Sequence, residues 1–180
     1  MPEPARPQRV FLLGMMGAGK SVVGAALADR LGWLYLDNDR RLHDTVGLQV
    51  DQAGAALGRR RLHELEREQA VRAAGEPPPL VAGLAASVVE QAALAPTIRA
   101  AGWCVYLRAR PETLVRRVGS GLGRPWLAPD PAAFVRRTLR RREPLYRALA
   151  DLIVNVDDAA PDQIAADIAH HLGLAAHPPE

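Results

Sequence analysis

One short stretch, GMMGAGKS at residues 14–21, constrains the fold more than any other part of the chain. It follows the apolar run RVFLL and precedes VVGAALADRLG, which has helical spacing and stops at a glycine. The stretch matches the pattern G-x-x-x-x-G-K-[ST], in the order of strand, loop and helix that the pattern requires. Such glycines let backbone N–H groups turn inward around phosphate oxygens, and the helix adds the positive end of its dipole. The sequence therefore predicts a phosphate-binding loop made of Gly14, Gly17, Ala18, Gly19, Lys20, Ser21 and Val22.

Lys20 is the only lysine of the chain, although lysine and arginine together number 23. A lysine ammonium on its flexible stem is a compact positive charge, and an arginine fork does not replace it. We expect Lys20 to reach the β- and γ-phosphates of a nucleotide and the Ser21 hydroxyl to bind Mg²⁺. The alternative is a glycine-rich turn between a strand and a helix that holds no ligand.

Five short apolar runs alternate with helix-like segments. The runs lie at residues 9–14, 34–37, 80–84, 104–109 and 152–156, and the helical patterns at 20–32, 60–74, 111–118, 131–142 and 161–173. This alternation predicts one α/β domain over residues 1–180, with a three-layer α/β/α architecture, a five-stranded parallel sheet and an ordered core over about residues 9–173. The Gly- and Pro-rich segment GSGLGRPWLAPDP, residues 119–131, is long enough to form a mobile lid.

The composition of the chain limits the classes of partner that it is expected to bind. The net charge is only +3 and aromatic residues make up 4%, so a surface on which nucleic-acid bases stack is not expected. No apolar run reaches the length of a membrane span, and the first ten residues lack the apolar core of a secretory signal. The single cysteine, Cys104, lies in the apolar run WCVYL, where we expect a buried and unreactive thiol. These features predict a cytoplasmic protein with no membrane or nucleic-acid partner.

Two carboxylates end the second apolar run, in the segment LYLDND. Alternate side chains of a strand point to opposite faces, but where the strand ends both Asp37 and Asp39 can reach the space beside the phosphate loop. One carboxylate would then serve a metal ion and the other an acceptor hydroxyl. The alternative for Asp39 is that it caps a helix beginning with RRLHD.

With the phosphate loop, Asp37-Asn38-Asp39, GRPWL and RREPLY, the sequence resembles the shikimate kinase family from about residue 9 to residue 173. The resemblance implies a P-loop kinase fold, ATP and Mg²⁺ as cofactors, and a hydroxyl of shikimate or a related cyclic alcohol as acceptor of the γ-phosphoryl group. It implies that Asp37 helps to position Mg²⁺, while Asp39 holds the acceptor hydroxyl and can take its proton. Lys20 and Arg124 complete the catalytic set that it implies.

The same resemblance gives roles to three arginines and a proline. Arg124, in GRPWL, falls where a lid arginine of the family closes over the transferring phosphate. Arg117 and Pro161 fall where the family holds adenine, and Arg142, in RREPLY, falls where an arginine grips the shikimate carboxylate. The other arginines of RRTLRRR are interpreted as a solvated helix face, the alternative being a nucleic-acid patch.

Two places depart from the family pattern, both on the acceptor side. His63 stands where the family has a second arginine for the substrate carboxylate, and Leu84-Ala85-Ala86 stands where the family has three glycines. A mostly neutral imidazole does not replace a bidentate guanidinium. Side chains at the glycine positions limit the approach of substrate to the backbone, and any positive φ there would be costly. We therefore expect shikimate to bind weakly.

Three hypotheses follow from the combination of retained catalytic residues and altered acceptor residues. The first is a working kinase for shikimate or a related cyclic alcohol, the second is a kinase with a different acceptor, and the third is a nucleotide-binding module without catalysis. The retained catalytic residues favour the first two, because a pure binding protein needs no carboxylate at the acceptor. The altered acceptor residues favour the third. In each case we expect a monomer with a small-molecule partner.

Overall fold

A five-stranded parallel sheet forms the centre of the protein, described by a computed structural model that covers residues 8–48, 50–119 and 130–175. The strands lie in the order β2-β3-β1-β4-β5. They span Arg9–Leu13 (β1), Leu34–Asp37 (β2), Leu80–Gly83 (β3), Trp103–Arg108 (β4) and Leu152–Asn155 (β5). Each matches a predicted apolar run to within one residue at either end, so the predicted α/β fold is confirmed.

The central strands are buried on both faces. In β1, Leu12 lies opposite Gly83 of β3 on one side and Val105 of β4 on the other. Every residue of β3, and every residue of β1 after Arg9, is buried. Strands covered on both faces read as continuous apolar runs without alternation, which explains why RVFLL and LVAG show no polar face.

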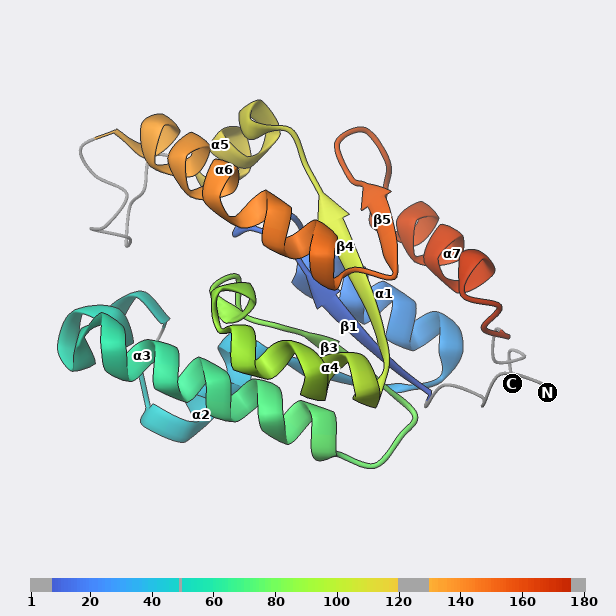
Figure 1. Ribbon diagram of the computed structural model, residues 1–180. Coiled ribbons are helices and arrows are strands. Elements are labelled where there is room, and N and C mark those ends of the chain that lie inside the picture. Colours follow the sequence, from blue (N-terminus) through green and yellow to red (C-terminus); the bar gives the residue numbers. More distant parts are fainter. Residues whose placement is uncertain (1–7, 49, 120–129, 176–180) are drawn as a thin grey trace.

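Helices form the two outer layers (Figure 1). On one face α1 (Lys20–Leu31) packs against α7 (Pro161–His171), and on the other α4 (Ala95–Ala101) and α6 (Pro131–Leu149) lie over β4. Next to α6 is α5 (Pro111–Val118), whereas α2 (Asn38–Val46) and α3 (Val50–Gly75) pack together beyond β2. Two short 3₁₀ turns, η1 (Val88–Glu90) and η2 (Ala92–Leu94), connect β3 to α4.

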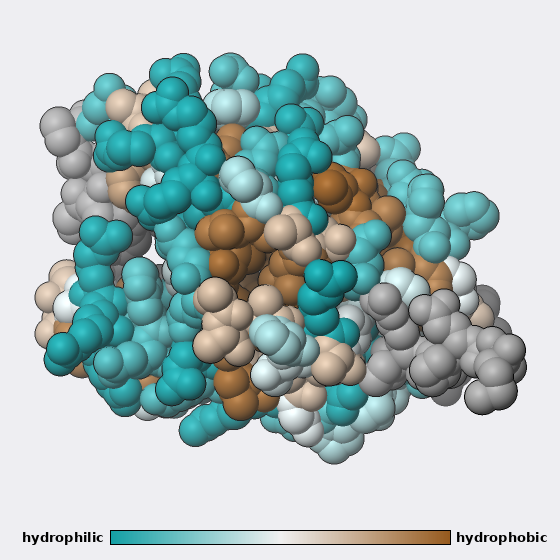
Figure 2. Space-filling model, in the orientation of Figure 1, coloured by the Kyte–Doolittle hydropathy of each residue, from teal (hydrophilic) through white to brown (hydrophobic). Residues whose placement is uncertain are grey.

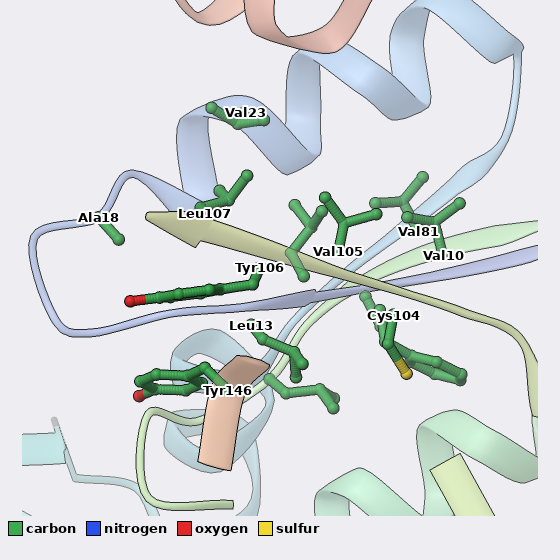
Figure 3. Packing of buried hydrophobic residues seen from close by; sticks show 14 of the residues in the cluster. Val10, Leu13, Ala18, Val23, Val81, Cys104, Val105, Tyr106, Leu107 and Tyr146 are labelled. Carbon is green, nitrogen blue, oxygen red and sulfur yellow. The ribbon is translucent and has the colours of Figure 1, made fainter. Parts of the chain in front are cut away.

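An aromatic stack anchors α6 to the sheet. The rings of Tyr106 on β4 and Tyr146 on α6 are nearly parallel, with centroids 4.8 Å apart, on the opposite side of β4 from Val23 of α1 (Figure 3). The Tyr146 hydroxyl donates to the carbonyl oxygen of Ala86 at 2.7 Å, so the stack also fixes the chain just after β3. Cys104 of β4 is buried in the same core, as predicted.

Four helices differ in part from the sequence-based prediction. The predicted helix at residues 131–142 continues past Pro144 to Leu149, because the buried face that includes Leu139 and Tyr146 outweighs the hydrogen bond that proline removes. Neither α2 nor α4 was among the predicted helical segments, although a helix beginning with RRLHD was kept as the alternative for Asp39; α2 has 9 residues and α4 has 7. The predicted helix at 60–74 matches the part of α3 that follows Gly58, a non-helical residue at which α3 is kinked, and the helical part that begins at Val50 was not predicted.

Most of the predicted lid, residues 119–131, lies outside the described residues. Among the helices that the structure describes, none combines the length and the apolar character needed to cross a lipid bilayer. Hydrophilic side chains cover much of α3 and α6 on the face shown in Figure 2, with a hydrophobic patch between them.

Candidate active site

The phosphate loop joins the end of β1 to the start of α1, and two of its glycines are needed for its shape. Gly14 has φ +149°, and a Cβ atom there would lie 2.8 Å from the carbonyl oxygen of Leu107. Gly19 has φ +93° and is the N-cap of α1. It has no side chain to cover the first turn, which reads KSVV and contains no carboxylate. The start of α1 is therefore a suitable place for an anion.

The Lys20 side chain folds back over this loop. Its ammonium donates to the carbonyl oxygens of Gly14 at 2.9 Å and Met15 at 3.1 Å. Burial lowers the pKa of Lys20 to about 8, and the nearby carboxylates of Asp39 and Asp37 oppose this shift. A partly desolvated ammonium held over the loop is in a position to pair with an anion that enters the loop.

Asp37 lies at the end of β2 and is hydrogen-bonded to Ser21, the other residue predicted to bind the metal ion. Its Oδ1 atom accepts hydrogen bonds from the backbone N–H groups of Asp39 at 2.9 Å and Arg40 at 3.1 Å, so Asp37, not Asp39, caps the following helix α2. Its Oδ2 atom accepts from the Tyr35 hydroxyl at 3.0 Å. Although burial opposes ionisation, hydrogen bonds from Ser21 and from these groups hold the pKa of Asp37 below its usual value. Asp37 is thus an anion beside the Ser21 hydroxyl.

Ser21 and Asp37 fit the needs of Mg²⁺ only as part of a larger set of ligands. Mg²⁺ prefers six oxygen ligands, and it is commonly held by one or two carboxylates together with phosphates and water. Among the described residues no group of three or more His, Cys, Asp or Glu side chains could hold a metal ion alone. The residues present therefore suit a cation that arrives with a nucleotide.

Asp39 lies in the first turn of α2, exposed, and faces Lys20. It has the largest carboxylate effect on the pKa of Lys20, ahead of Asp37. The Nδ2 atom of Asn38 donates to Asp39 Oδ1 at 3.3 Å, and Asn38 itself is buried. The sequence analysis did not identify Asn38 as a residue that positions Asp39. Its place between two candidate aspartates could have indicated this role.

A small cavity lies behind Asn38. It is lined by Leu36, Asn38, Arg41, Gln69, Ala73, Ala82, Gly83 and Leu84. Three polar atoms on these residues are buried and lack a hydrogen-bond partner among the described residues: Asn38 Oδ1, Arg41 Nη1 and Gln69 Oε1.

On α3, His63 and Glu66 face the space between α3 and α6. Burial lowers the pKa of His63, and the guanidinium groups of Arg59 and Arg142 add to this, so the imidazole is neutral at pH 7. Burial raises the pKa of Glu66, although its Oε2 atom accepts a hydrogen bond from the Ser87 hydroxyl. His63 therefore supplies no positive charge in place of the arginine of the family pattern.

The segment Leu84-Ala85-Ala86 follows β3 without a strained backbone. Among the described residues, positive φ occurs only at glycines, so the cost considered for these positions does not arise. Leu84 and Ala85 are buried, and the backbone N–H of Leu84 donates to the carbonyl oxygen of Leu12 at 3.1 Å. The remaining difference from a glycine turn is the space that the side chains occupy.

Arg142 is buried on α6 and is engaged by an internal carboxylate. Its Nη2 and Nε atoms donate to Glu90 Oε2 at 2.7 Å and 3.0 Å. The other oxygen of Glu90 accepts from Arg141 Nε at 2.6 Å. Arg142 also lowers the pKa of Lys20 and of His63, which places its charge in the same site. Glu90 was not predicted, since its partners are 51 and 52 residues away and no local pattern marks it.

The predicted adenine-binding residues lie near the other end of the loop. Arg117 on α5 donates to the carbonyl oxygens of Val156 at 2.8 Å and Gly17 at 3.4 Å, so it packs beside the phosphate loop. Pro161 is the first residue of α7. Arg124 lies outside the described residues.

The carboxyl ends of β1, β2 and β3 thus bring together the groups that the sequence singled out, between α2 and α3 on one side and α5 and α6 on the other (Figure 1). The sequence matches the family model for shikimate kinase over residues 16–173. The chain belongs to the shikimate kinase family. The shikimate kinase of Moorella thermoacetica is 33% identical over 166 residues, covering 92% of this chain and 95% of that protein. That of Salinispora arenicola is 36% identical over 159 residues, covering 88% and 93%.

Solved structures of shikimate kinases share the fold. The enzyme from Acinetobacter baumannii, solved in complex with shikimate, superposes with a TM-score of 0.87 at 27% identity and covers 93% of both chains. The enzyme from Bacteroides thetaiotaomicron gives a TM-score of 0.82 at 25% identity, covering 92% of this chain and 98% of that one. The structural likeness therefore extends over more than nine tenths of the chain and is not limited to the phosphate loop.

Proposed function

We propose that this shikimate kinase family member is an ATP-dependent phosphotransferase that moves the γ-phosphoryl group of Mg-ATP to a hydroxyl of shikimate. The observation that carries the proposal is the grouping of Lys20, Asp37 and Asp39 around the start of α1, where both carboxylates act on the pKa of the lysine. A ligand-free turn does not explain a half-buried ammonium facing two carboxylates, because burial of that charge is costly.

The chemistry assigned to each residue follows from its position. The loop amides and Lys20 would hold the β- and γ-phosphates, and Ser21 and Asp37 would hold Mg²⁺, which would offset the negative charge on the transferring group. Asp39 accepts a hydrogen bond from the acceptor hydroxyl and orients its oxygen for attack. The bond from phosphorus to the acceptor oxygen forms as the bond to the ADP oxygen breaks, ADP keeps the electron pair, and the hydroxyl proton passes to Asp39.

On the acceptor side the proposal assigns Arg142 to the shikimate carboxylate, with His63 and the segment 84–86 forming neighbouring walls. Arg117 and Pro161 are assigned to adenine. All the residues assigned here belong to one domain, and the proposal takes this domain as a monomeric enzyme.

The proposal predicts a specific effect of Asp39→Asn. Without the acceptor carboxylate, kcat should fall by roughly 10²–10⁴-fold, the range expected for a lost general base, with little change in the KM for Mg-ATP. The measurement is steady-state ADP release with shikimate, together with phosphorus NMR of the product. Asp44→Asn is the matched control, since Asp44 is an exposed aspartate on the same helix. If the wild-type protein releases ADP no faster with shikimate than without it, the proposed function is wrong.

A kinase with a different acceptor is the second candidate. The observations in its favour are the neutral His63 and the engagement of Arg142 by Glu90, which both weaken a carboxylate site. The same assay with neutral cyclic alcohols in place of shikimate separates the two candidates.

A further inference from the structure

One edge of the Arg142 guanidinium is occupied by hydrogen bonds to another side chain of the protein. The Nε and Nη2 atoms both donate to Glu90, and the Arg142 side chain is only 8% exposed. A carboxylate binds arginine best through two parallel hydrogen bonds along one edge. A carboxylate ligand that approaches Arg142 therefore meets a guanidinium whose Nε edge is already taken.

Glu90 is fixed in this position by its surroundings. Its backbone N–H donates to the carbonyl oxygen of Ser87 at 3.0 Å within η1, and the next side chain, Gln91, donates to the carbonyl oxygen of His63 at 3.1 Å. Both oxygens of the Glu90 carboxylate are bonded to arginines, which hold its pKa below the usual value although burial opposes this. Glu90 is therefore an anion at neutral pH, at the end of η1 and against α6.

The charge of the site follows from these contacts. Glu90 offsets the charge of Arg142, the neutral His63 adds none, and the second guanidinium on Glu90, that of Arg141, is more than half exposed and screened by water. An anionic acceptor at Arg142 would be repelled by Glu90 and would have to displace it. A neutral acceptor would meet neither cost.

We infer that Glu90 is a specificity-determining residue of the acceptor site: it occupies Arg142 as an internal competitor of the acceptor carboxylate and lowers the affinity for anionic acceptors. This inference rests on the proposed function, because it takes Arg142 as the residue that meets the acceptor. Glu90 lies outside the sequence motifs of the family. In this inference it sets how strongly the site prefers an acceptor with a carboxylate over an uncharged acceptor.

The test is Glu90→Gln, which keeps the shape of the side chain and one acceptor oxygen but removes the charge. Binding of shikimate and of its uncharged methyl ester is measured by calorimetry in the presence of Mg-ADP. The Kd for shikimate should fall roughly tenfold, the lower end of what a charged hydrogen bond contributes, while the Kd for the methyl ester stays within about twofold. In turnover the gain should appear in the KM for shikimate and leave the KM for Mg-ATP unchanged.

Glu143→Gln is the matched control. Glu143 is also 25% exposed and also bonded to two arginines, Arg108 and Arg147, so it tests for a general effect of removing a paired carboxylate. Its Kd for shikimate should match that of the wild type. Retained Mg-ADP binding and an unchanged circular dichroism spectrum establish that each variant is folded, and Glu90→Ala provides a second variant.

An unchanged or higher Kd for shikimate in folded Glu90→Gln and Glu90→Ala would overturn the inference, and a higher value would mean that Glu90 orients Arg142 for the substrate. An equal gain for the methyl ester would also overturn it. Failure of the proposed function is a separate result: the protein would transfer no phosphoryl group to shikimate. The calorimetric titration with shikimate would still measure the effect of Glu90 on binding. The inference would likewise be overturned if neither variant bound shikimate.

Discussion

Among single residues, Lys20 has a protonation equilibrium that depends strongly on its surroundings. Its ammonium is desolvated in the ligand-free loop and bonded to two backbone carbonyls, with two carboxylates facing it. A phosphate group that replaces the carbonyls would favour the charged form far more strongly. Ligand binding and protonation of this side chain are therefore coupled.

The pH dependence of nucleotide binding follows from this coupling. The pKa of Lys20 is about 8 in the ligand-free protein, and bound phosphates raise it. The affinity for Mg-ATP should therefore be constant below pH 8 and weaken by up to about tenfold per pH unit above it. Calorimetric titrations between pH 6.5 and pH 9.5 measure this change. Lys20→Ala should bind more weakly and show no change of slope near pH 8, and a wild-type affinity that is flat to pH 9.5 would contradict the prediction.

At the level of elements, α3 contains a break at Gly58, two residues before the helix predicted from the sequence begins. Gly58 has φ +79° and ψ 155°, a backbone region that is almost restricted to glycine, and it precedes the turn that carries His63. No atom lies within 4 Å of the place where a Cβ atom would be, so space is not the constraint. Backbone conformation alone requires glycine here.

Gly58→Ala should therefore lower the free energy of unfolding by about 1–3 kcal/mol, the range for a residue held in a sparsely populated region. Gly75→Ala is the control on the same helix, because Gly75 has equal space and no positive φ. That change should be neutral or stabilise the protein by up to about 1 kcal/mol. Urea unfolding followed by circular dichroism measures both values. Equal effects of the two substitutions would show that the break in α3 carries no conformational cost.

Across the whole molecule, the candidate site exists only when the sheet and both helical layers are assembled. Its residues come from β2, the loop after β1, α3 and α6, which are far apart in the unfolded chain. Any ligand that needs several of these groups binds the folded state alone. Ligand binding should then stabilise the entire fold, as mass action requires.

Mg-ADP should accordingly raise the Tm of the wild-type protein. At a concentration about 100 times its Kd the expected stabilisation is about 2.7 kcal/mol. Removal of the metal with EDTA should reduce the shift, because Ser21 and Asp37 contact the nucleotide through Mg²⁺ in the proposed arrangement. Lys20→Ala should reduce it as well. Differential scanning calorimetry measures these shifts, and a Tm that does not respond to saturating Mg-ADP would count against nucleotide binding.

The sequence by itself determined the sheet and the phosphate loop. The five strands and the glycines of the loop depend on local properties, such as continuous apolar runs, a strand followed by a helix, and backbone angles that glycine permits. The sequence also placed Asp37 at the end of a strand and Asp39 directly after it, which the structure shows as the end of β2 and the first turn of α2. These features could be predicted because each one is encoded within a few neighbouring residues.

Only the tertiary structure decided the roles of groups that meet across long separations. It made Asp37 the helix cap and the partner of Ser21, and it continued α6 past Pro144 because the buried face of that helix packs on the sheet. It also placed Glu90 on Arg142, which lies 52 residues further along the chain. The physical reason is that burial and long-range ion pairs depend on which elements the fold brings together, and no local pattern of residues contains that information.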